Sequence, residues 1–360
     1  MKIYAVHLLN DYSGSPKVLM QLVRGWTRGG FDVTVVTSSG RDGFLSNLPG
    51  ASYIHYWYRW AAHPLLRLLC LSASQLHLFW KLLRYAHKND IIYINTVLPF
   101  GAAFAGKLKG CRVIYHVHET TMSPRVLKAF LFGVMRWAAA DVVYVSSYLA
   151  KAEPVSSSVT HVLYNAIENV FLEEARKNIQ PERAPQNVLM ICSLKRYKGV
   201  EEFFALAVRH PDLSFRLVVN ASQVDIQKYL GMRVVPSNLE LFPVQSNVHP
   251  FYQWADVVVN LSRPDQWIET FGLTIIEGMA YGLPSIVPPV GGIAELVEEG
   301  MNGFHADSRN IEEVSAKLGQ ICTPRLYAQL QAKARRCIER YREDTFIHHS
   351  ISILKVQPVE

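Results

Sequence analysis

Short apolar runs alternate along this chain with longer segments whose apolar residues recur every three or four positions. Residues 3–9 form one apolar run, residues 18–26 have helical spacing, and residues 32–38 form the next run. Uninterrupted apolar runs are typical of strands buried on both faces of a parallel sheet, and a spacing of three to four indicates a helix. The first 38 residues therefore predict a strand–helix–strand unit.

The same alternation continues to the C-terminus and predicts an α/β fold with parallel sheets. We expect further strands at residues 91–95, 113–116, 141–147, 188–193, 215–220, 239–242 and 257–261, and helices at 251–256, 274–280, 311–318, 326–342 and 346–354. A chain of 360 residues exceeds the size at which one hydrophobic core keeps growing, so two domains are expected. We place the first at 1–170, a polar, proline-containing linker at 171–187, and the second at 188–343.

Two carboxylates, Glu269 and Glu277, lie in a segment that does not alternate as a surface strand does. Phe271 and Gly272 between them predict a tight turn, because glycine carries no Cβ. The residues that follow have helical character, so Glu269 is expected to precede a helix and Glu277 to lie one turn inside it.

The start of this helix has the properties of an anion site. The backbone N–H groups of Leu273 and Thr274 have no partner within the helix, and the helix dipole favours an anion such as a diphosphate. Carboxylates on either side can accept hydrogen bonds from hydroxyl groups. A nucleotide sugar carries both phosphates and hydroxyls, whereas a pair of glutamates alone would also fit a solvated helix face.

The order of residues in this region resembles the signature of glycosyltransferase family 4 (group 1). The resemblance includes the two glutamates with Phe-Gly-Leu between them, Ala-Tyr-Gly-Leu-Pro at 280–284, Gly-Gly-Ile-Ala-Glu at 291–295, and the turn at 300–304. It implies retention of configuration and the GT-B fold, two Rossmann-like doubly wound domains facing each other across a cleft. It also implies that 344–360 is a C-terminal helix crossing back to the first, acceptor-binding domain. By the same resemblance Glu277 accepts the ribose hydroxyls and Glu269 the hydroxyls of the transferred sugar.

Two positions of the first domain match the family less closely. Gly14 lies in the loop after the first strand, where family members place glycines near the donor phosphate or the acceptor; an ordinary strand-to-helix turn is the alternative. His118 follows a buried strand, at the end where parallel sheets bind ligands. The resemblance places such a histidine close to the transferred sugar, and Glu119 is its expected partner, with His116 deeper on the same face. A hydrogen-bonded structural histidine is the alternative.

The second domain contains basic residues where the family binds the diphosphate. Lys198 matches the family lysine, but Ser193 occupies the position of the family arginine. Either Arg196 or Lys195 supplies that charge, or the diphosphate is held more loosely. Val244 follows an expected strand at the point where the resemblance implies backbone contacts to the base, for which we expect uracil.

Other features limit the chemistry. No Asp-x-Asp triplet is present, so we expect no bound metal and no cofactor beyond the nucleotide-sugar substrate. The five cysteines lack the spacing of a zinc site or a disulfide framework. Three other functions use related features: a nucleotide-sugar epimerase of the same fold, a phosphorylase-like enzyme, and a non-catalytic carbohydrate-binding protein. No motif supports the pyridoxal phosphate lysine that the second would need.

The net charge of +7 is unevenly distributed. Residues 1–165 hold 17 Lys/Arg against 7 Asp/Glu, and residues 166–360 hold 20 against 23. The basic half indicates an anionic partner, for which a membrane surface is favoured because no nucleic-acid-binding motif is present. Residues 52–60 and 64–87 are rich in aromatic, leucine and basic residues, which fits either a packed strand and helix or a membrane-facing patch.

No signal peptide or membrane span is expected, since the apolar run of residues 3–9 is too short for one. We therefore expect a cytoplasmic enzyme, peripheral on the inner face of the cytoplasmic membrane. It would transfer sugars from a UDP-linked donor to a lipid-linked glycan in bacterial surface polysaccharide synthesis.

Overall fold

The computed structural model describes residues 1–177 and 184–355. It contains two compact units, one formed by Met1–Asn165 with Glu343–Glu360 and the other by Ala166–Arg342. Helix α6 (Asn169–Lys177) occupies the first part of the expected linker. Its charged residues suggested a solvated linker, but Phe171, Leu172 and Ala175 form a buried apolar face that makes the segment a packed helix. Residues 178–183 of the expected linker lie outside the described residues.

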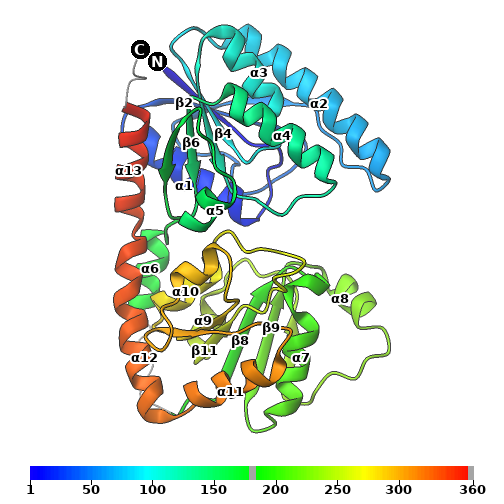
Figure 1. Ribbon diagram of the computed structural model, residues 1–360, viewed down its shortest axis with the longest axis vertical. Coiled ribbons are helices and arrows are strands. Elements are labelled where there is room, and N and C mark those ends of the chain that lie inside the picture. Colours follow the sequence, from blue (N-terminus) through cyan, green and yellow to red (C-terminus); the bar gives the residue numbers. More distant parts are fainter. Residues whose placement is uncertain (178–183, 356–360) are drawn as a thin grey trace. The chain divides into compact units, whose positions relative to one another are not determined.

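The first unit is built on a seven-stranded parallel sheet with strand order β3-β2-β1-β4-β5-β6-β7 (Figure 1). Its strands are β1 (Lys2–Val6), β2 (Asp32–Ser38), β3 (Ala51–Tyr56), β4 (Ile91–Asn95), β5 (Arg112–Val117), β6 (Asp141–Tyr144) and β7 (Val159–Val162). Its helices are α1 (Gly14–Arg28), α2 (Pro64–Tyr85), α3 (Phe100–Lys109), α4 (Arg125–Ala138), α5 (Ser147–Ala152) and α13 (Glu343–Lys355).

The second unit repeats this architecture with a six-stranded parallel sheet in the order β10-β9-β8-β11-β12-β13. Its strands are β8 (Asn187–Cys192), β9 (Ser214–Val219), β10 (Leu239–Phe242), β11 (Val257–Val259), β12 (Ser285–Val287) and β13 (Gly303–His305). Besides α6 its helices are α7 (Val200–Arg209), α8 (Gln223–Leu230), α9 (His249–Trp254), α10 (Leu273–Ala280), α11 (Ile311–Ile321) and α12 (Pro324–Cys337), with 3₁₀ turns η1 (Arg196–Lys198), η2 (Gly292–Leu296) and η3 (Ile338–Tyr341).

The apolar pattern predicted most strands closely, because buried parallel strands are apolar throughout. The bounds predicted for β2, β4 and β10 are confirmed. The expectation that Gly14 lies in the loop after the first strand is wrong, since α1 already begins at Gly14 and includes Pro16 in its first turn. Proline is tolerated there because the first turn of a helix requires no backbone donor.

Both sheets contain one point at which the strand order reverses. In the first unit this point lies between β1 and β4, and in the second between β8 and β11. The loops after the two flanking strands leave the sheet edge in opposite directions there, which opens a crevice at the carboxyl ends of the strands. The residues that follow β1, β4, β8 and β11 are therefore the first candidates for ligand contacts.

Residues 51–56 and 64–85 form a strand and a helix, as one interpretation of the aromatic and leucine-rich segment expected. Helix α2 is nevertheless only partly packed against the first unit, and its buried residues are Leu71, Ser74, Gln75, Leu78 and Leu82. All residues from 64 to 69 are exposed, four of them leucines. This exposed apolar surface is unusual for a helix whose only role is packing.

The terminal helix α13 is bound to the first unit by a buried arginine. Arg112 Nε donates to Asp141 Oδ2 at 2.8 Å, and its two terminal nitrogens donate to the carbonyls of Ile353 and Leu354 at 2.9 and 3.0 Å. Asp141 also lies 3.0 Å from His161 Nε2. The guanidinium therefore neutralises a buried carboxylate and caps the C-terminus of α13.

We predict that Arg112→Ala destabilises the first unit by about 3–5 kcal/mol, because it leaves the Asp141 carboxylate buried beside His161 alone. Hydrogen exchange should show faster amide exchange across residues 343–355, together with a lower melting temperature. Arg176→Ala is the matched control. Its pair with Glu339 is about half exposed on both side chains (53% and 50%), so a loss of about 1 kcal/mol or less is expected. Unchanged protection of α13 in Arg112→Ala would contradict the capping role.

Candidate functional site

Lys198 and Glu269 form a buried ion pair at the reversal point of the second unit. Lys198 follows β8, Glu269 follows β11, and Lys198 Nζ lies 2.6 Å from Glu269 Oε1. Their side chains are only 14% and 15% exposed. Burial alone would raise the pKa of Glu269, but the charge and hydrogen bond of Lys198, together with hydrogen bonds from Ser262 and Trp267, lower that pKa below the usual value. Glu269 is therefore ionised at neutral pH.

Polar and aromatic groups fix the orientation of this pair. Ser262 Oγ donates to Glu269 Oε1 at 2.6 Å, and Trp267 Nε1 donates to Oε2 at 3.3 Å. The Lys198 ammonium lies 4.8 Å from the centre of the Trp267 ring, and that ring stacks on Tyr197 with 5.1 Å between centroids. Two loops that are far apart in sequence thus hold each other in place around the charges.

Two glycines allow the backbone to approach this closely. Gly199 has a φ of +81°, and a Cβ there would lie 2.1 Å from the carbonyl oxygen of Leu261. Gly291 has a φ of +99°, and a Cβ there would lie 2.4 Å from the carbonyl oxygen of Glu269. Any other residue at either position would push apart the loops that carry the ion pair.

Glu277 lies inside α10 as predicted, but it is more deeply buried than a ligand-contacting carboxylate was expected to be. Glu277 is only 7% exposed, and its Oε2 accepts a hydrogen bond from the hydroxyl of Tyr252 at 2.8 Å. Tyr252 is itself fully buried, which together with the Glu277 charge raises its pKa well above the usual value. Glu277 therefore has a structural contact in addition to any contact with a ligand.

The segment from Phe271 to Thr274 forms the start of α10. The first hydrogen bonds of the helix run from the N–H groups of Ile275 and Ile276 to the carbonyl of Gly272. The N–H groups of Leu273 and Thr274 precede these bonds, as an anion site at a helix N-terminus requires.

The reason for glycine at position 272 differs from the expected one. Its φ of −151° is open to any residue, but a Cβ there would lie 2.7 Å from the Ile293 side chain. Close packing, rather than a tight turn, therefore requires glycine. Phe271 beside it is 7% exposed and contributes mainly to the core.

The remaining predicted residues of this unit are peripheral. Arg196 and Lys195 are exposed, and neither takes part in an ion pair found among the described residues. Both could therefore swing toward a phosphate. Val244 is 54% exposed, and its N–H already donates to the carbonyl of Ala221 at 3.0 Å. A contact between Val244 and a base would have to use the Val244 carbonyl.

The first unit holds its predicted histidine after β5, next to the reversal point between β1 and β4. His118 follows β5, and its Nε2 lies 2.8 Å from Oδ1 of Asn95, the last residue of β4. The amide nitrogen of Asn95 donates to the carbonyl of Ser15 at 3.0 Å, immediately after Gly14 in α1. Asn95 therefore connects His118 to the Gly14 segment, and because its Oδ1 only accepts, it makes Nε2 the protonated nitrogen of His118.

Glu119 had been expected to be the partner of the His118 ring, but it is not. Its carboxylate instead accepts from the backbone N–H groups of His118 and Val97, at 3.1 and 3.3 Å. Burial raises the pKa of Glu119 to about 7 despite these bonds.

The histidines of this cluster are neutral. Burial lowers the pKa of His118 well below its usual range, with further lowering by nearby His116 and His7. Burial likewise lowers the pKa of His116 to about 3 and that of His7 to about 4. His116 lies on the same face as His118, with 4.3 Å between ring centroids, as predicted. At neutral pH the cluster offers uncharged hydrogen-bonding groups rather than cations.

Sequence reasoning missed the residues that orient the expected ones. Asn95 could have been found, because it ends a predicted strand at the edge where parallel sheets bind ligands. Ser262 and Trp267 lie in the loop that carries Glu269, but no spacing indicates their hydrogen bonds. Within residues 1–177 and 184–355 no group of three or more His, Cys, Asp or Glu residues is arranged to hold a metal ion.

Comparisons with known proteins agree with this geometry. A model described as "Glycosyltransferase Family 4" matches residues 12–169, and one described as "Glycosyl transferases group 1" matches residues 185–323. An uncharacterized glycosyltransferase of Haemophilus influenzae is 27% identical over 49% of this chain and 51% of its own length. Sucrose synthase 2 of Pisum sativum is also 27% identical, over 38% of this chain and 19% of its own length. The matched region thus spans about half or less of these relatives.

Solved structures extend the similarity to the whole fold. HepE from Anabaena, in complex with UDP and glucose, has 18% sequence identity and a TM-score of 0.78 over 99% of this chain and 100% of that one. Sucrose-phosphate synthase from Thermosynechococcus elongatus has 15% identity and a TM-score of 0.79 over 98% of both chains. With both family models matched and two parallel α/β units of this topology, the chain belongs to the family 4, group 1 glycosyltransferases and has their GT-B fold.

Proposed function

We propose that this chain is a retaining, metal-independent glycosyltransferase that moves a sugar from a UDP-linked donor to a lipid-linked glycan. The observation that carries the proposal is the buried pair of Lys198 and Glu269 at the reversal point of the second unit. A cation and an anion held this close, beside a helix N-terminus, match a ligand that carries phosphates and hydroxyls together.

Each group of the second unit has a proposed role in donor binding. Lys198 and the N-terminus of α10 stabilise the diphosphate, first as a ligand and then as a leaving group, with Arg196 as the exposed residue able to join them. Glu277 accepts the ribose hydroxyls while Tyr252 holds its other side. Glu269 accepts hydroxyls of the transferred sugar and keeps Lys198 aligned.

His118 is proposed to hydrogen-bond the transferred sugar or the acceptor. Its neutral ring is held by Asn95 with Nε2 protonated, so it orients hydroxyl groups without adding charge. Gly14 lies in the helix turn connected to the same asparagine through Ser15. The first unit would therefore present an uncharged face to the reacting sugar.

The choice of UDP and of a surface glycan rests on named relatives. HepE was solved with UDP and glucose, and also with UDP-glucose. A lipopolysaccharide outer core galactosyltransferase, WaaB, has a TM-score of 0.72 at 17% identity over 98% of both chains. These proteins support a UDP-linked donor and a role in bacterial surface polysaccharide assembly for this chain.

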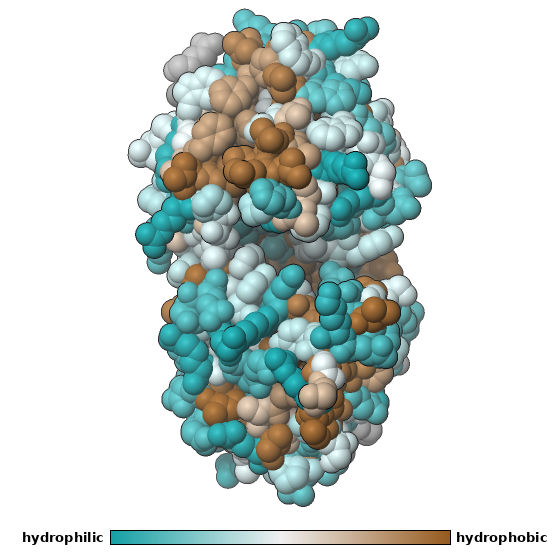
Figure 2. Space-filling model, turned by 90° about the vertical axis from the view of Figure 1, so that its right-hand side faces the viewer, coloured by the Kyte–Doolittle hydropathy of each residue, from teal (hydrophilic) through white to brown (hydrophobic). Residues whose placement is uncertain are grey.

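An exposed apolar surface of the first unit supports a membrane-borne acceptor at the inner face of the cytoplasmic membrane. Leu65, Leu66, Leu68 and Leu69 of α2 are 67%, 54%, 47% and 64% exposed. Figure 2 views the side on which α2 lies in Figure 1 and shows apolar side chains gathered on this unit. Within the described residues no helix is long and apolar enough to cross a membrane.

Basic and aromatic side chains accompany these leucines. Trp57 and Trp60 are 43% and 51% exposed, and the Arg67 guanidinium lies 4.9 Å from the centre of the Trp60 ring. Leucines that enter the acyl boundary, tryptophans at headgroup depth and arginines near the phosphates are the arrangement of a peripheral membrane helix.

The function is tested with a panel of nucleotide sugars. We expect UDP-sugars to raise the melting temperature more than GDP- or ADP-sugars, and UDP to be released in the presence of lipid-linked glycan acceptors. Transfer to a glycan with the α-linkage retained separates a transferase from an epimerase, which would need no acceptor, and from a protein that only binds carbohydrate. Binding without release of UDP in any of these mixtures would contradict the proposal.

We predict that Glu269→Gln lowers turnover roughly 10- to 100-fold, equivalent to the loss of about 1.5–3 kcal/mol from a hydrogen bond to a charged group. Affinity for free UDP should stay close to that of the unchanged chain, because Glu269 contacts the sugar. Calorimetry with UDP and steady-state kinetics measure the two effects. A parallel collapse of UDP affinity and turnover would mean that Glu269 acts on the diphosphate instead.

For Glu277 we predict separable effects on stability and binding. Glu277→Ala removes the closer acceptor of the buried Tyr252 hydroxyl, which also reaches the Thr274 carbonyl at 3.3 Å, and should cost about 1–3 kcal/mol of stability as well as UDP binding. Tyr252→Phe is the matched control, since it removes the same hydrogen bond but keeps the carboxylate. It should lose stability and retain UDP binding by calorimetry. If Tyr252→Phe loses UDP binding as fully as Glu277→Ala, Glu277 does not contact the ribose.

Liposome co-sedimentation tests the membrane surface. Binding should require anionic lipid, weaken with salt, and fall when Arg59, Arg67, Lys81 and Arg84 are neutralised, because each basic residue near such a surface contributes about 1 kcal/mol. Replacing the four exposed leucines of α2 by serine should also reduce it. Val208 and Val224 of the second unit, 66% and 72% exposed, give a control pair for the same change. Equal binding to neutral vesicles would favour a soluble acceptor.

A further inference from the structure

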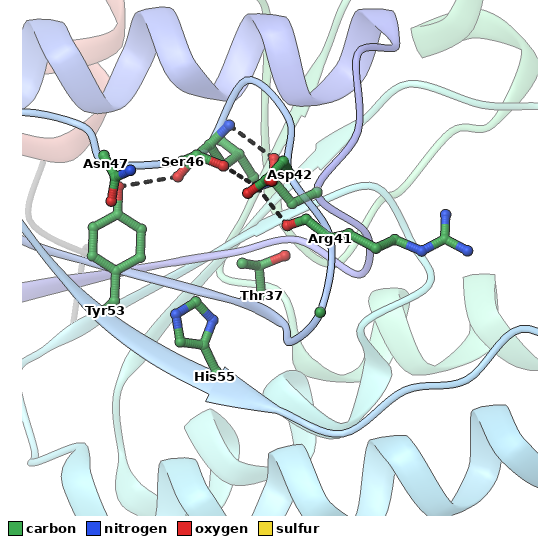
Figure 3. A pocket seen from close by; sticks show the side chains of 10 residues that line it. Thr37, Arg41, Asp42, Ser46, Asn47, Tyr53 and His55 are labelled. Carbon is green, nitrogen blue, oxygen red and sulfur yellow. Dashed lines mark hydrogen bonds between the residues drawn. The ribbon is translucent and has the colours of Figure 1, made fainter.

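A second, polar pocket lies in the first unit, away from the reversal point. It has a volume of about 490 Å³ and lies between the ends of β2 and β3 and the loop that joins them (Figure 3). That volume is within the range of small-molecule sites, about 300–1,000 Å³. Neither the donor groups of the second unit nor the His118 cluster includes any residue that lines it.

The loop over this pocket is held in a fixed shape. Asn10 Oδ1 accepts from the N–H of Leu45 at 2.9 Å, and its amide nitrogen donates to Ser46 Oγ at 2.8 Å. The Tyr53 hydroxyl donates to the carbonyl of Leu45 at 3.0 Å. Gly43 packs against this anchor, since a Cβ there would lie 2.4 Å from the backbone nitrogen of Asp11. The pocket is therefore preorganised rather than formed by a loose loop.

A buried hydroxyl in the wall of the pocket makes no hydrogen bond within the described residues. Thr37, on β2, is 1% exposed, and its Oγ1 is unpartnered. A buried hydroxyl left without a partner costs about 1–3 kcal/mol. The Thr37 Oγ1 has almost no accessible surface, so a ligand hydroxyl recovers this free energy when Thr37 turns its Oγ1 into the pocket. This group distinguishes the pocket from a solvated surface hollow.

Aromatic rings lie beside Thr37 on the same face of the sheet, because Thr37 of β2 is paired with His55 of β3. Tyr53 and His55 alternate on β3, so both point to the same face, and their rings stack with 5.8 Å between centroids and 19° between planes. Flat rings of this kind can pack against the C–H groups of a sugar ring. Aromatic rings next to the polar side chains of the loop, such as Ser46 and Asn47, suit a ligand with an apolar face and hydroxyl edges.

The pocket carries no net charge. Arg41 and Asp42 both line it and offset each other. In Figure 3 the Arg41 guanidinium points away from Thr37 and His55. An anionic ligand would therefore meet no concentrated positive charge at the polar end of the pocket, which favours an uncharged hydroxylated ligand over a phosphate.

We propose that this pocket is an acceptor subsite that binds an uncharged sugar unit other than the one that is glycosylated. The proposal rests on the proposed glycosyltransferase function. Three strand positions separate β2 from β5, which carries His118, a distance of roughly 14 Å across the sheet. A sugar in the pocket is thus too far from His118 to react there, and the subsite would read a more remote part of the glycan.

The test localises binding with a methyl reporter. Protein labelled with ¹³C at threonine methyls is titrated with glucose, galactose and glucuronic acid at millimolar concentration, with UDP present to occupy the donor site. We expect the Thr37 methyl signal to shift with at least one neutral sugar and to shift less with glucuronic acid. No shift with any of the three, or tighter binding of glucuronic acid than of both neutral sugars, would overturn the proposal.

Variants then separate the pocket from general effects on the fold. Ligand-detected saturation transfer should show about tenfold weaker binding in Thr37→Val and in His55→Ala, the equivalent of one lost contact of about 1.4 kcal/mol. Thr34→Val is the matched control, because Thr34 lies on the same strand, is buried and also has an unpartnered hydroxyl, but does not line the pocket. Equal losses in Thr34→Val would assign the effect to the strand and contradict the subsite.

Thermal shift with UDP-glucose and other UDP-sugars distinguishes the two proposals. If UDP-sugars bind and support transfer but Thr37 does not respond, the subsite is wrong and the transferase function stands. If Thr37 responds to neutral sugars and no UDP-sugar binds or supports transfer, the pocket binds sugars and the transferase function is wrong.

Discussion

The reversal of strand order in each sheet is the constraint on which the candidate sites depend. A parallel sheet places the carboxyl ends of all its strands at one edge, and the loops after neighbouring strands diverge only where the order reverses. Lys198 and Glu269 come from the loops after β8 and β11 and meet at that point. Asn95 and the start of α1 meet in the same way after β4 and β1. In both units, polar side chains beside a buried sheet thus meet at the point where the strand order reverses.

The Lys198–Glu269 pair is better explained by ligand binding than by stability. Removing two charges from water costs several kcal/mol per ion, and their attraction only offsets that cost when further hydrogen bonds complete the geometry. Ser262 and Trp267 supply such bonds to the carboxylate, and the Trp267 ring lies beneath the ammonium. We propose that these groups hold the two charges in place for a ligand. A diphosphate and a sugar hydroxyl are the groups that would use them.

The first unit has the opposite electrostatic character at its reversal point. His7, His116 and His118 are all kept neutral by burial, although the unit as a whole carries an excess of basic residues. The basic residues proposed to bind the membrane lie instead on α2, which also carries the exposed leucines, and in the segment before it. The first unit thus places the basic residues proposed to bind a membrane surface apart from the neutral histidines proposed to bind sugars. The pocket between β2 and β3 continues this uncharged character along the same sheet edge.

The sequence by itself determined the α/β class, most strands and two charged residues, Lys198 and Glu269, that the structure brings together. An uninterrupted apolar run indicates that a strand is buried on both faces, so strands can be predicted without knowing their neighbours. The glycines and glutamates around Glu269 lie close together in the sequence, so their order is also visible without the structure. The helical character of residues 169–177 was harder to predict, because its apolar face is narrow and its remaining residues are charged. Gly14 was assigned to a turn because proline follows it closely, although a helix accepts proline in its first turn.

Only the tertiary structure decided which side chains meet. The His118 ring contacts Asn95, which lies 23 residues away, whereas Glu119 accepts hydrogen bonds from the backbone N–H groups of His118 and Val97. Glu277 shares its carboxylate with Tyr252, which comes from a different helix. The pocket around Thr37 depends on a loop held by Asn10, which has no sequence signature. Hydrogen bonds across loops depend on distances set by the packing of whole sheets, and these distances are not encoded in any local spacing.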